Sequence, residues 1–114
     1  MKRVTLREAR ALLIQHGALC QENLERLIKV TEDFPFLSPA LRRQIPKLFI
    51  QQRTSLELVD RLLEMEEDAD ITKEMLRLLK HLERYQNFSG RVIAEGDYVV
   101  AAYRRQLLTP EQLQ

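Results

Sequence analysis

The residues best suited to chemistry are a histidine and a cysteine in the N-terminal third of the sequence. His16 and Cys20 are four positions apart, which places both side chains on one face of a helix. That spacing could present an imidazole and a thiolate to one metal ion, or pair a nucleophile with its base. A structural zinc site needs four ligands, however, and His81 is the only further histidine or cysteine in the chain. Because a buried cysteine usually behaves as a small apolar residue, we predict no metal, cofactor or catalytic role for the pair.

A second chemical candidate is the acidic run at positions 64–70. Its oxygens would suit a divalent cation, but the run lacks the glycine-centred ligand spacing of a calcium loop. We interpret it as a solvated helix end, with Glu64 and Glu67 available to a partner. The sequence also contains no glycine-rich phosphate loop and no HExxH, CxxC or Gly-x-Ser-x-Gly motif. We therefore predict that the protein is not an enzyme.

Charge is unevenly distributed along the chain, although the net charge is only +1. Segment 38–56 has no acidic residue but contains the basic residues Arg42, Arg43, Lys47 and Arg53. Segment 57–74, by contrast, is strongly acidic. Acidic side chains at the C-terminal end of a helix oppose its macrodipole, so a basic surface should face them. We expect Arg42, Arg43 and Lys47 to form that surface, in the same chain or in a second copy that would make a homodimer.

Capping signals divide the sequence into helices. Capping boxes or capping residues stand at Thr5, Ser38, Thr54, Asp70 and Thr109. Two apolar stripes follow helical spacing, namely Leu6, Ala9, Leu13, His16, Cys20, Leu24 and Leu27, and then Ile71, Met75, Leu78, Leu82 and Tyr85. Gly17 should end a helix, and Pro46 should kink or split the helix of segment 38–52. The sequence therefore predicts an all-α fold of five or six short helices.

The helix starts at Thr5, Ser38 and Ile71 are spaced evenly, 33 residues apart. Each interval has room for two helices and two turns, which suggests antiparallel helical hairpins. We predict that these hairpins form an orthogonal bundle or a short helical-repeat-like stack.

Segment 91–105 is the ambiguous part of the chain, because its apolar runs flank Glu-Gly-Asp as in a β-hairpin. An isolated two-stranded hairpin is marginal in water, and no other segment offers a strand to pair with it. As a helix, it places Val92, Val99, Tyr103 and Leu107 on one face. We predict a helix that stops near Gly96, restarts at Asp97 and ends at Leu108, the alternative being a strand added to another chain.

Length and composition limit the class of protein. A chain of 114 residues supports one hydrophobic core, so we predict a single domain over 1–114. Its single cysteine excludes an intrachain disulfide. The N-terminal sequence lacks the uninterrupted apolar stretch of a signal peptide, and no window approaches the roughly 18 apolar residues of a membrane span. We expect a cytoplasmic protein that does not contact membranes.

Taken together, these observations favour a non-catalytic adaptor, chaperone or regulatory subunit that binds another protein through a helical groove and charged faces. Phe34 and Phe36 either join the core or act as anchors, because the proline between them preorganises the loop. The predicted partner-binding residues are Arg42, Arg43, Lys47, Phe34, Phe36, Glu64, Glu67 and Tyr103. The alternative is a small DNA- or RNA-binding regulator that uses Arg42, Arg43 and Lys47, although the acidic segment would repel a polyanion.

Overall fold

A computed structural model describes residues 2–33, 38–92 and 97–113 of the protein. The helices are α1 (Leu6–Asp33), α2 (Pro39–Leu63), α3 (Thr72–Val92), α4 (Asp97–Leu107) and α5 (Pro110–Leu113). Within these ranges no strand forms, and the only β feature is an isolated bridge between Thr5 and Asp70. The predicted all-α fold is confirmed.

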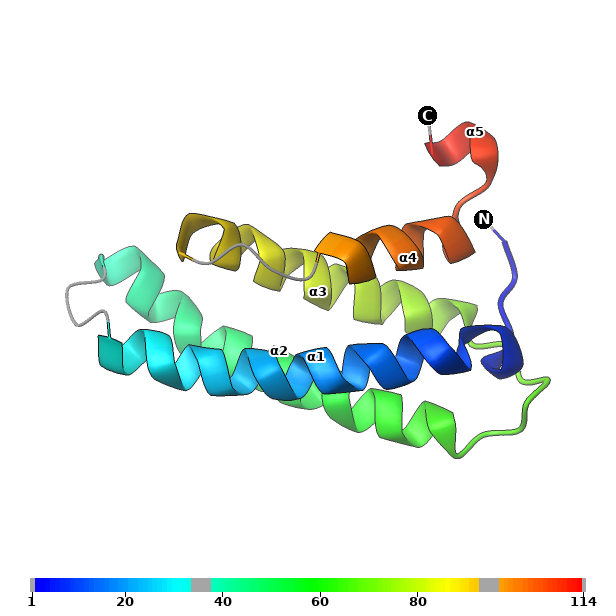
Figure 1. The fold of residues 1–114 in the computed structure, drawn as a ribbon, viewed down its shortest axis with the longest axis horizontal. Helices are drawn as coiled ribbons and strands as arrows, with labels where there is room; N and C mark the ends of the chain where they lie inside the picture. The colour runs from blue at the N-terminus through cyan, green and yellow to red at the C-terminus, as the bar shows by residue number, and fades with distance from the viewer. Residues whose placement is uncertain (1, 34–37, 93–96, 114) are drawn as a thin grey trace.

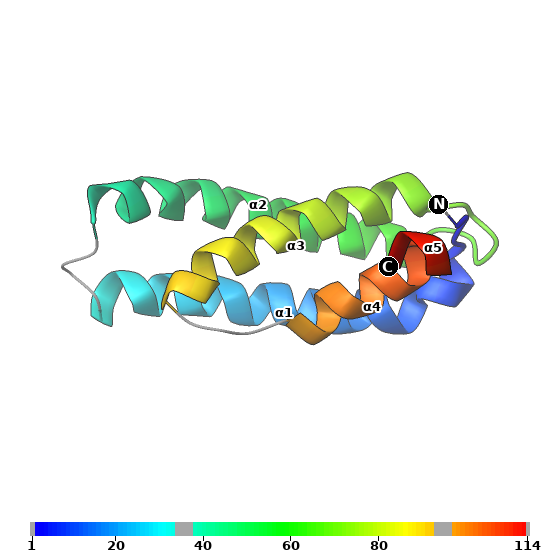
Figure 2. The same ribbon diagram turned by 90° about the horizontal axis from the view of Figure 1, so that it is seen from above.

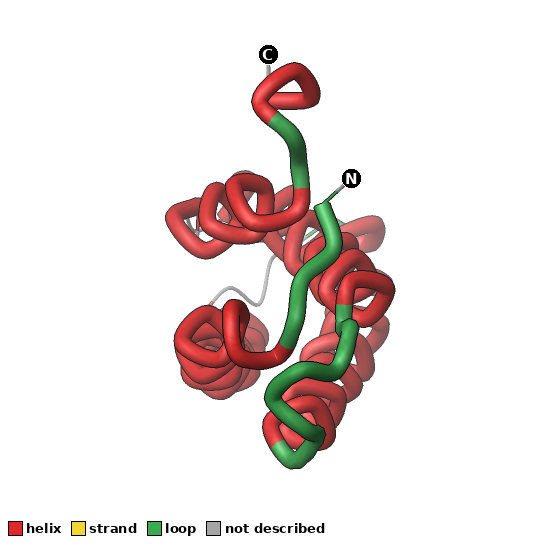
Figure 3. Tube along the Cα trace, turned by 90° about the vertical axis from the view of Figure 1, so that its right-hand side faces the viewer, coloured by secondary structure: helices red, strands yellow, loops and turns green. Residues whose placement is uncertain are grey.

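The four longer helices form two tiers of antiparallel hairpins (Figure 1). The α1–α2 hairpin makes one tier, and α3 and α4 make the other. Around the bundle, α1 packs on α2, α2 on α3, α3 on α4 and α4 on α1. Seen from above, α3 runs obliquely over the α1–α2 pair, and α4 covers the part of α1 nearest the termini (Figure 2). The end-on view shows the short α5 standing apart from the bundle beyond α4 (Figure 3).

The hydrophobic core consists of two clusters along the bundle. The larger cluster lies at the end with the termini and includes Leu6, Leu13, Leu62, Met75, Leu78 and Tyr103. The smaller cluster lies toward the α1–α2 connection and contains Leu27, Val30, Ile45, Leu48, Tyr85 and Phe88. Both predicted apolar stripes are buried as expected, except that Leu24 is only half-buried.

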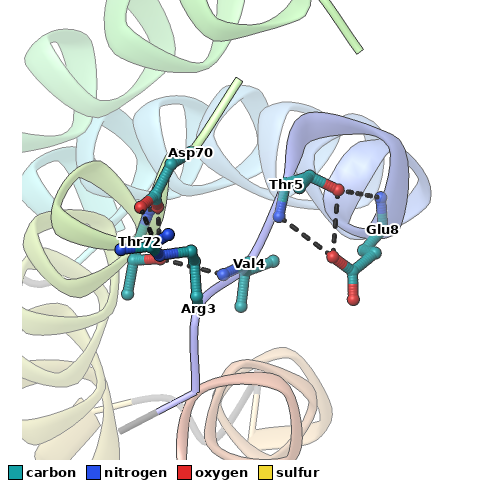
Figure 4. Close-up of polar contacts among 6 residues, drawn as sticks. All are labelled: Arg3, Val4, Thr5, Glu8, Asp70 and Thr72. Atoms are coloured by element: carbon teal, nitrogen blue, oxygen red, sulfur yellow. Dashed lines mark hydrogen bonds and ion pairs between the residues drawn. The ribbon is translucent and has the colours of Figure 1, made fainter. Parts of the chain in front are cut away.

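Local capping sets the start of each long helix. The Thr5 and Glu8 side chains form the predicted capping box, in which the Thr5 backbone N–H donates to Glu8 Oε1 at 3.2 Å (Figure 4). The Asp70 carboxylate accepts the Thr72 backbone N–H at 3.0 Å. The Val4 backbone N–H donates to the Thr72 hydroxyl oxygen at 2.9 Å, which joins the N-terminal segment to the start of α3 (Figure 4). Helices α1, α2 and α3 thus begin at residues 6, 39 and 72, and the 33-residue spacing is confirmed.

Two helices were predicted in each 33-residue interval, but each of the first two intervals contains one long helix instead. Helix α1 has 28 residues and passes through Gly17, and α2 has 25 residues and passes through Pro46 and the expected start at Thr54. The predictions of short helices, of a break at Gly17, of a split at Pro46 and of a start at Thr54 were therefore wrong.

Tertiary packing explains this continuity. A Cβ atom at Gly17 would lie 3.4 Å from Val59 Cγ1 and 3.9 Å from Leu56 Cδ1, so the glycine sits where α1 approaches α2 closely. Burial along 28 residues outweighs the roughly 1 kcal/mol that a glycine costs within a helix. Pro46 is exposed, so water can hydrate the carbonyl group that loses its helical donor.

The ambiguous segment is helical at both described ends. Helix α3 ends at Val92, and α4 begins at Asp97 as predicted and ends at Leu107, one residue early. Residues 93–96 lie outside the described ranges. Val99, Tyr103 and Leu107 are fully buried, which places the predicted apolar face of α4 against the core.

Candidate functional site

The His16 and Cys20 side chains lie inside the bundle and away from solvent. His16 Nδ1 and the Tyr103 hydroxyl oxygen are hydrogen-bonded at 2.6 Å, and the two rings meet edge to face with centroids 5.2 Å apart. Burial, with a smaller contribution from nearby His81, lowers the pKa of His16 to about 4, so its imidazole is neutral at pH 7. His16 is therefore a hydrogen-bonded residue of the core.

Cys20 is held in the unreactive thiol form. It is fully buried, and burial raises the pKa of its thiol to about 12. A thiolate is the form that attacks electrophiles and binds metals. In the part of the chain that the structure describes, no three histidine, cysteine or acidic side chains are grouped so that they could hold a metal ion.

Further polar residues cross the bundle interior in pairs. The Asn23 side-chain amide of α1 donates to Gln52 Oε1 of α2 at 3.1 Å, and Ser55 Oγ of α2 is hydrogen-bonded to His81 Nδ1 of α3 at 2.9 Å. Each pair joins two neighbouring helices. The interior polar groups therefore fix the alignment of the helices.

The acidic run after α2 meets basic residues from the N-terminal part of the chain. Arg7 and Arg10 lie 3.1 and 3.6 Å from Glu67, and Arg3 lies 3.1 Å from Asp70. We call these five residues the terminal ion-pair cluster. The Asp70 pKa is lowered chiefly by hydrogen bonds from Thr72 and less by Arg3.

This arrangement corrects the expectation that Arg42, Arg43 and Lys47 face the acidic run within one chain. Those three residues lie near the start of α2, whereas the run follows its end (Figure 1). At 1.5 Å per residue, the two groups are roughly 30 Å apart. The version in which a second copy supplies the basic surface stays a prediction.

The basic residues of α2 have no acidic partner of their own. Arg42, Arg43, Lys47 and Arg53 are exposed, and none forms an ion pair within residues 2–33, 38–92 and 97–113. Arg43 Nε donates only to the Pro39 carbonyl at 3.2 Å. These cations are therefore free to interact with another molecule.

Three large apolar side chains are exposed on the same hairpin. Ile14 and Ile28 of α1 are 57% and 50% exposed, and Ile50 of α2 is 66% exposed. Residues seven apart lie along one side of a helix, which aligns Ile14, Gln21 and Ile28 on α1. The same spacing aligns Arg43, Ile50, Glu57 and Glu64 along α2 and its end.

Both rows point away from the upper tier. Helix α1 packs on α2 and α4, and α2 packs on α1 and α3, so their exposed sides turn away from α3 and α4. We call this side of the two helices the hairpin face, which comprises Ile14, Gln21, Ile28, Arg43, Lys47, Ile50, Glu57, Asp60 and Glu64.

The other predicted partner-binding residues occupy different places. Glu64 and Glu67 are exposed, but Glu67 is already paired with two arginines. Tyr103 is fully buried against His16, so it offers no surface to a partner in this conformation. Phe34 and Phe36 lie outside the described residues.

The three isoleucines were not selected from the sequence. For α1, the signal in the sequence is that Ile14 and Ile28 are fourteen residues apart, which is two steps of seven, and that neither belongs to the apolar stripe Leu6–Leu27. They therefore mark a second side of the same helix. Such scattered residues are common on surfaces, and only the fold shows that α1 and α2 place theirs side by side.

Two open pockets lie away from the hairpin face. One, of about 480 Å³, is lined by residues of α3, α4 and α5, including Glu83 and Arg104, which form an ion pair at 3.6 Å. The other, of about 470 Å³, lies beside the Arg3–Asp70 pair at the start of α3. Each pocket thus contains one exposed ion pair.

Comparisons of this chain with protein-family models, with curated proteins and with solved structures found no match. Among the described helices, none combines the length and the apolar content that crossing a bilayer requires.

Proposed function

We propose that this protein is non-catalytic and acts by binding another protein through the hairpin face. The observation that carries the proposal is the placement of Ile14, Ile28 and Ile50, all at least half exposed, on one side of a two-helix hairpin. A fold of this size has no structural need for them there. Large aliphatic side chains gathered on a surface and surrounded by charges are typical of protein interaction sites.

The charges of this face supply specificity. Arg43 and Lys47 lie on one half of α2, and Glu57, Asp60 and Glu64 lie on the other half. A partner with the complementary order of charges would be aligned along α2, while the isoleucines contribute apolar burial.

Nucleic-acid binding is the second candidate, because Arg42, Arg43, Lys47 and Arg53 are unpaired cations within the described part of the chain. Phosphate contacts do not require an exposed isoleucine at the centre of the basic surface, however, and Glu57 and Asp60 on the same helix repel a polyanion. A protein partner therefore accounts for more of the surface.

The test places a photocrosslinking amino acid at position 50, with Lys80 on the exposed side of α3 as the control position. We expect position 50, but not position 80, to crosslink a protein at defined stoichiometry in an extract of the organism that makes the chain. Ile28→Ser should abolish this crosslink while leaving the circular dichroism spectrum unchanged.

The alternative function gives a different result. If the crosslinked material is removed by nuclease, and if Arg42→Glu with Arg43→Glu abolishes salt-sensitive retention on duplex DNA, the nucleic-acid function replaces the protein-binding one. Equal crosslinking from positions 50 and 80 would contradict both.

A further inference from the structure

We propose that the protein bound by the hairpin face is a second copy of this chain, packed antiparallel on the first across a two-fold axis. This inference rests on the proposed function and names its partner. It is carried by the symmetry of the residues on the face, since an isologous interface must be complementary to itself.

The position of the axis follows from the register of α1 against α2. Gly17 lies opposite Val59, and Asn23 is hydrogen-bonded to Gln52. Because the helices are antiparallel, Gln21 of α1 lies at the level of Thr54 and Ser55 of α2. A two-fold axis that crosses both helices at right angles, and that passes Gln21 on α1, must therefore also pass the matching level on α2. We call these two levels the first and the second point.

The residues of α1 are symmetric about the first point. Ile14 and Ile28 are each seven residues from Gln21, and both are at least half exposed. In an antiparallel pair of α1 helices, Ile14 of one copy meets Ile28 of the other, and the two Gln21 side chains meet at the axis. This contact between Ile14 and Ile28 occurs twice in the dimer, once on each side of the axis.

The charges of α2 are complementary about nearly the level of the second point. Arg43 is ten residues before Arg53, and Glu64 is ten residues after Thr54. An antiparallel α2 pair therefore sets Arg43 against Glu64 of the other copy. Both side chains are exposed, and no ion pair within the described residues occupies them.

The agreement between the two helices is the central observation. The register within one chain comes from buried contacts, whereas the symmetric residues are on the opposite, exposed side. Nothing in the packing of the single chain requires the apolar centre of α1 and the charge centre of α2 to lie within about one residue of the same level. The second copy also supplies the basic surface that the acidic half of α2 lacks in its own chain.

The first experiment measures oligomeric state by light scattering on a sizing column at high micromolar concentration, followed by sedimentation equilibrium. We expect a dimer for the unmodified chain. Arg43→Glu or Glu64→Arg alone should weaken it roughly tenfold or more, because each change removes two ion pairs and creates two like-charge contacts. The double variant should restore the dimer, and Lys80→Glu, on α3, should have no effect.

A second experiment tests the axis directly. Gln21→Cys places two thiols at the axis, so mild oxidation should give a covalent dimer on a non-reducing gel. Gln15→Cys is the matched control, because Gln15 is also exposed but lies on another side of α1. A monomeric unmodified chain, no rescue in the double variant, or equal crosslinking from positions 15 and 21 would each overturn the proposed dimer.

These outcomes separate the dimer from the proposed function. If the chain is monomeric but position 50 still crosslinks a different protein, the dimer fails and the protein-binding function stands. If the chain is monomeric and position 50 crosslinks nothing, both fail. A dimer whose position 50 crosslinks its own copy supports both.

Discussion

Each of the two sides of α1 contains exceptions to the usual distribution of polar and apolar residues. The side toward the core carries His16 and Asn23, both fully buried, whereas the side toward solvent carries Ile14 and Ile28. The inner polar groups have partners on neighbouring helices, Tyr103 for His16 and Gln52 for Asn23. The outer apolar groups have no comparable explanation within the fold.

This difference shows which residues to consider for function. His16 and Cys20 resemble a reactive pair in the sequence, but their burial and hydrogen bonding make them part of the scaffold. Ile14 and Ile28 resemble ordinary helix residues, but they are exposed, as is Ile50 of α2, and do not contribute to the core. Each of the following measurements sets a residue of the inner side, or of the terminal ion-pair cluster, against a matched residue elsewhere.

The largest expected contrast is between two adjacent residues, Leu13 and Ile14. Leu13→Ala removes a fully buried side chain and should lower the free energy of unfolding by about 2–5 kcal/mol. Ile14→Ala, measured at a concentration at which the chain is monomeric, should change it by about 0.5 kcal/mol or less. Urea unfolding followed by circular dichroism measures both, and equal losses would mean that Ile14 is not a surface residue.

The next largest effect is the pH dependence from His16. Its pKa is about 4 in the folded protein and 6.5 in its ordinary state, so the unfolded chain binds more protons between these values. Stability should therefore be full above pH 6.5 and should fall by about 3 kcal/mol as the pH decreases to 4. The lowered pKa of His81 acts in the same direction.

Urea unfolding at a series of pH values from 7 to 4 tests this expectation, with His16→Gln as the comparison. The variant loses one titrating group, so its stability should vary less over this range whatever its stability at pH 7. An unchanged pH dependence in the variant would show that His16 is not the buried neutral group described here.

A smaller effect should follow from removing one hydroxyl group at the inner side. Tyr103→Phe deletes the partner of His16 Nδ1 and should cost about 1–3 kcal/mol, because a buried polar atom is left unpaired. Tyr98→Phe makes the same chemical change on the same helix, where the side chain is exposed, and should be neutral. Equal costs from the two variants in thermal unfolding would contradict this placement of Tyr103.

Local signals in the sequence predicted the helix starts well. Thr5, Ser38 and Asp70 act through hydrogen bonds to residues two to four positions away, so their effect is visible in a few letters. The start of α4 at Asp97 was predictable for the same reason. The helix lengths were not, because Gly17 and Pro46 have local costs that packing between distant segments overcomes.

The candidate site was less accessible to sequence reasoning. The basic residues of α2 were selected from charge alone. Whether the acidic run was available to pair with them depended on Arg3, Arg7 and Arg10, which lie 57 or more positions from their acidic partners. Tyr103 was selected as an aromatic contact, and its burial depends on the packing of α4 on α1. The nearly common level of Gln21 and of the midpoint between Arg43 and Glu64 could be found only from the register of the hairpin.

The smallest expected effect compares two glutamates of the acidic run. Glu67→Gln breaks the exposed contacts to Arg7 and Arg10 and should cost about 0.2–1 kcal/mol of stability, less at high salt. Glu64→Gln removes no ion pair within the described residues, so the unfolding of the monomeric chain should be unchanged. If the proposed dimer forms, the order should reverse at concentrations that favour it, because in that dimer Glu64 contacts Arg43 of the second copy and Glu67 does not. Unfolding curves at low and high concentration measure both, and a stability of the Glu64→Gln variant that matches the unmodified chain at every concentration would place Glu64 outside any interface.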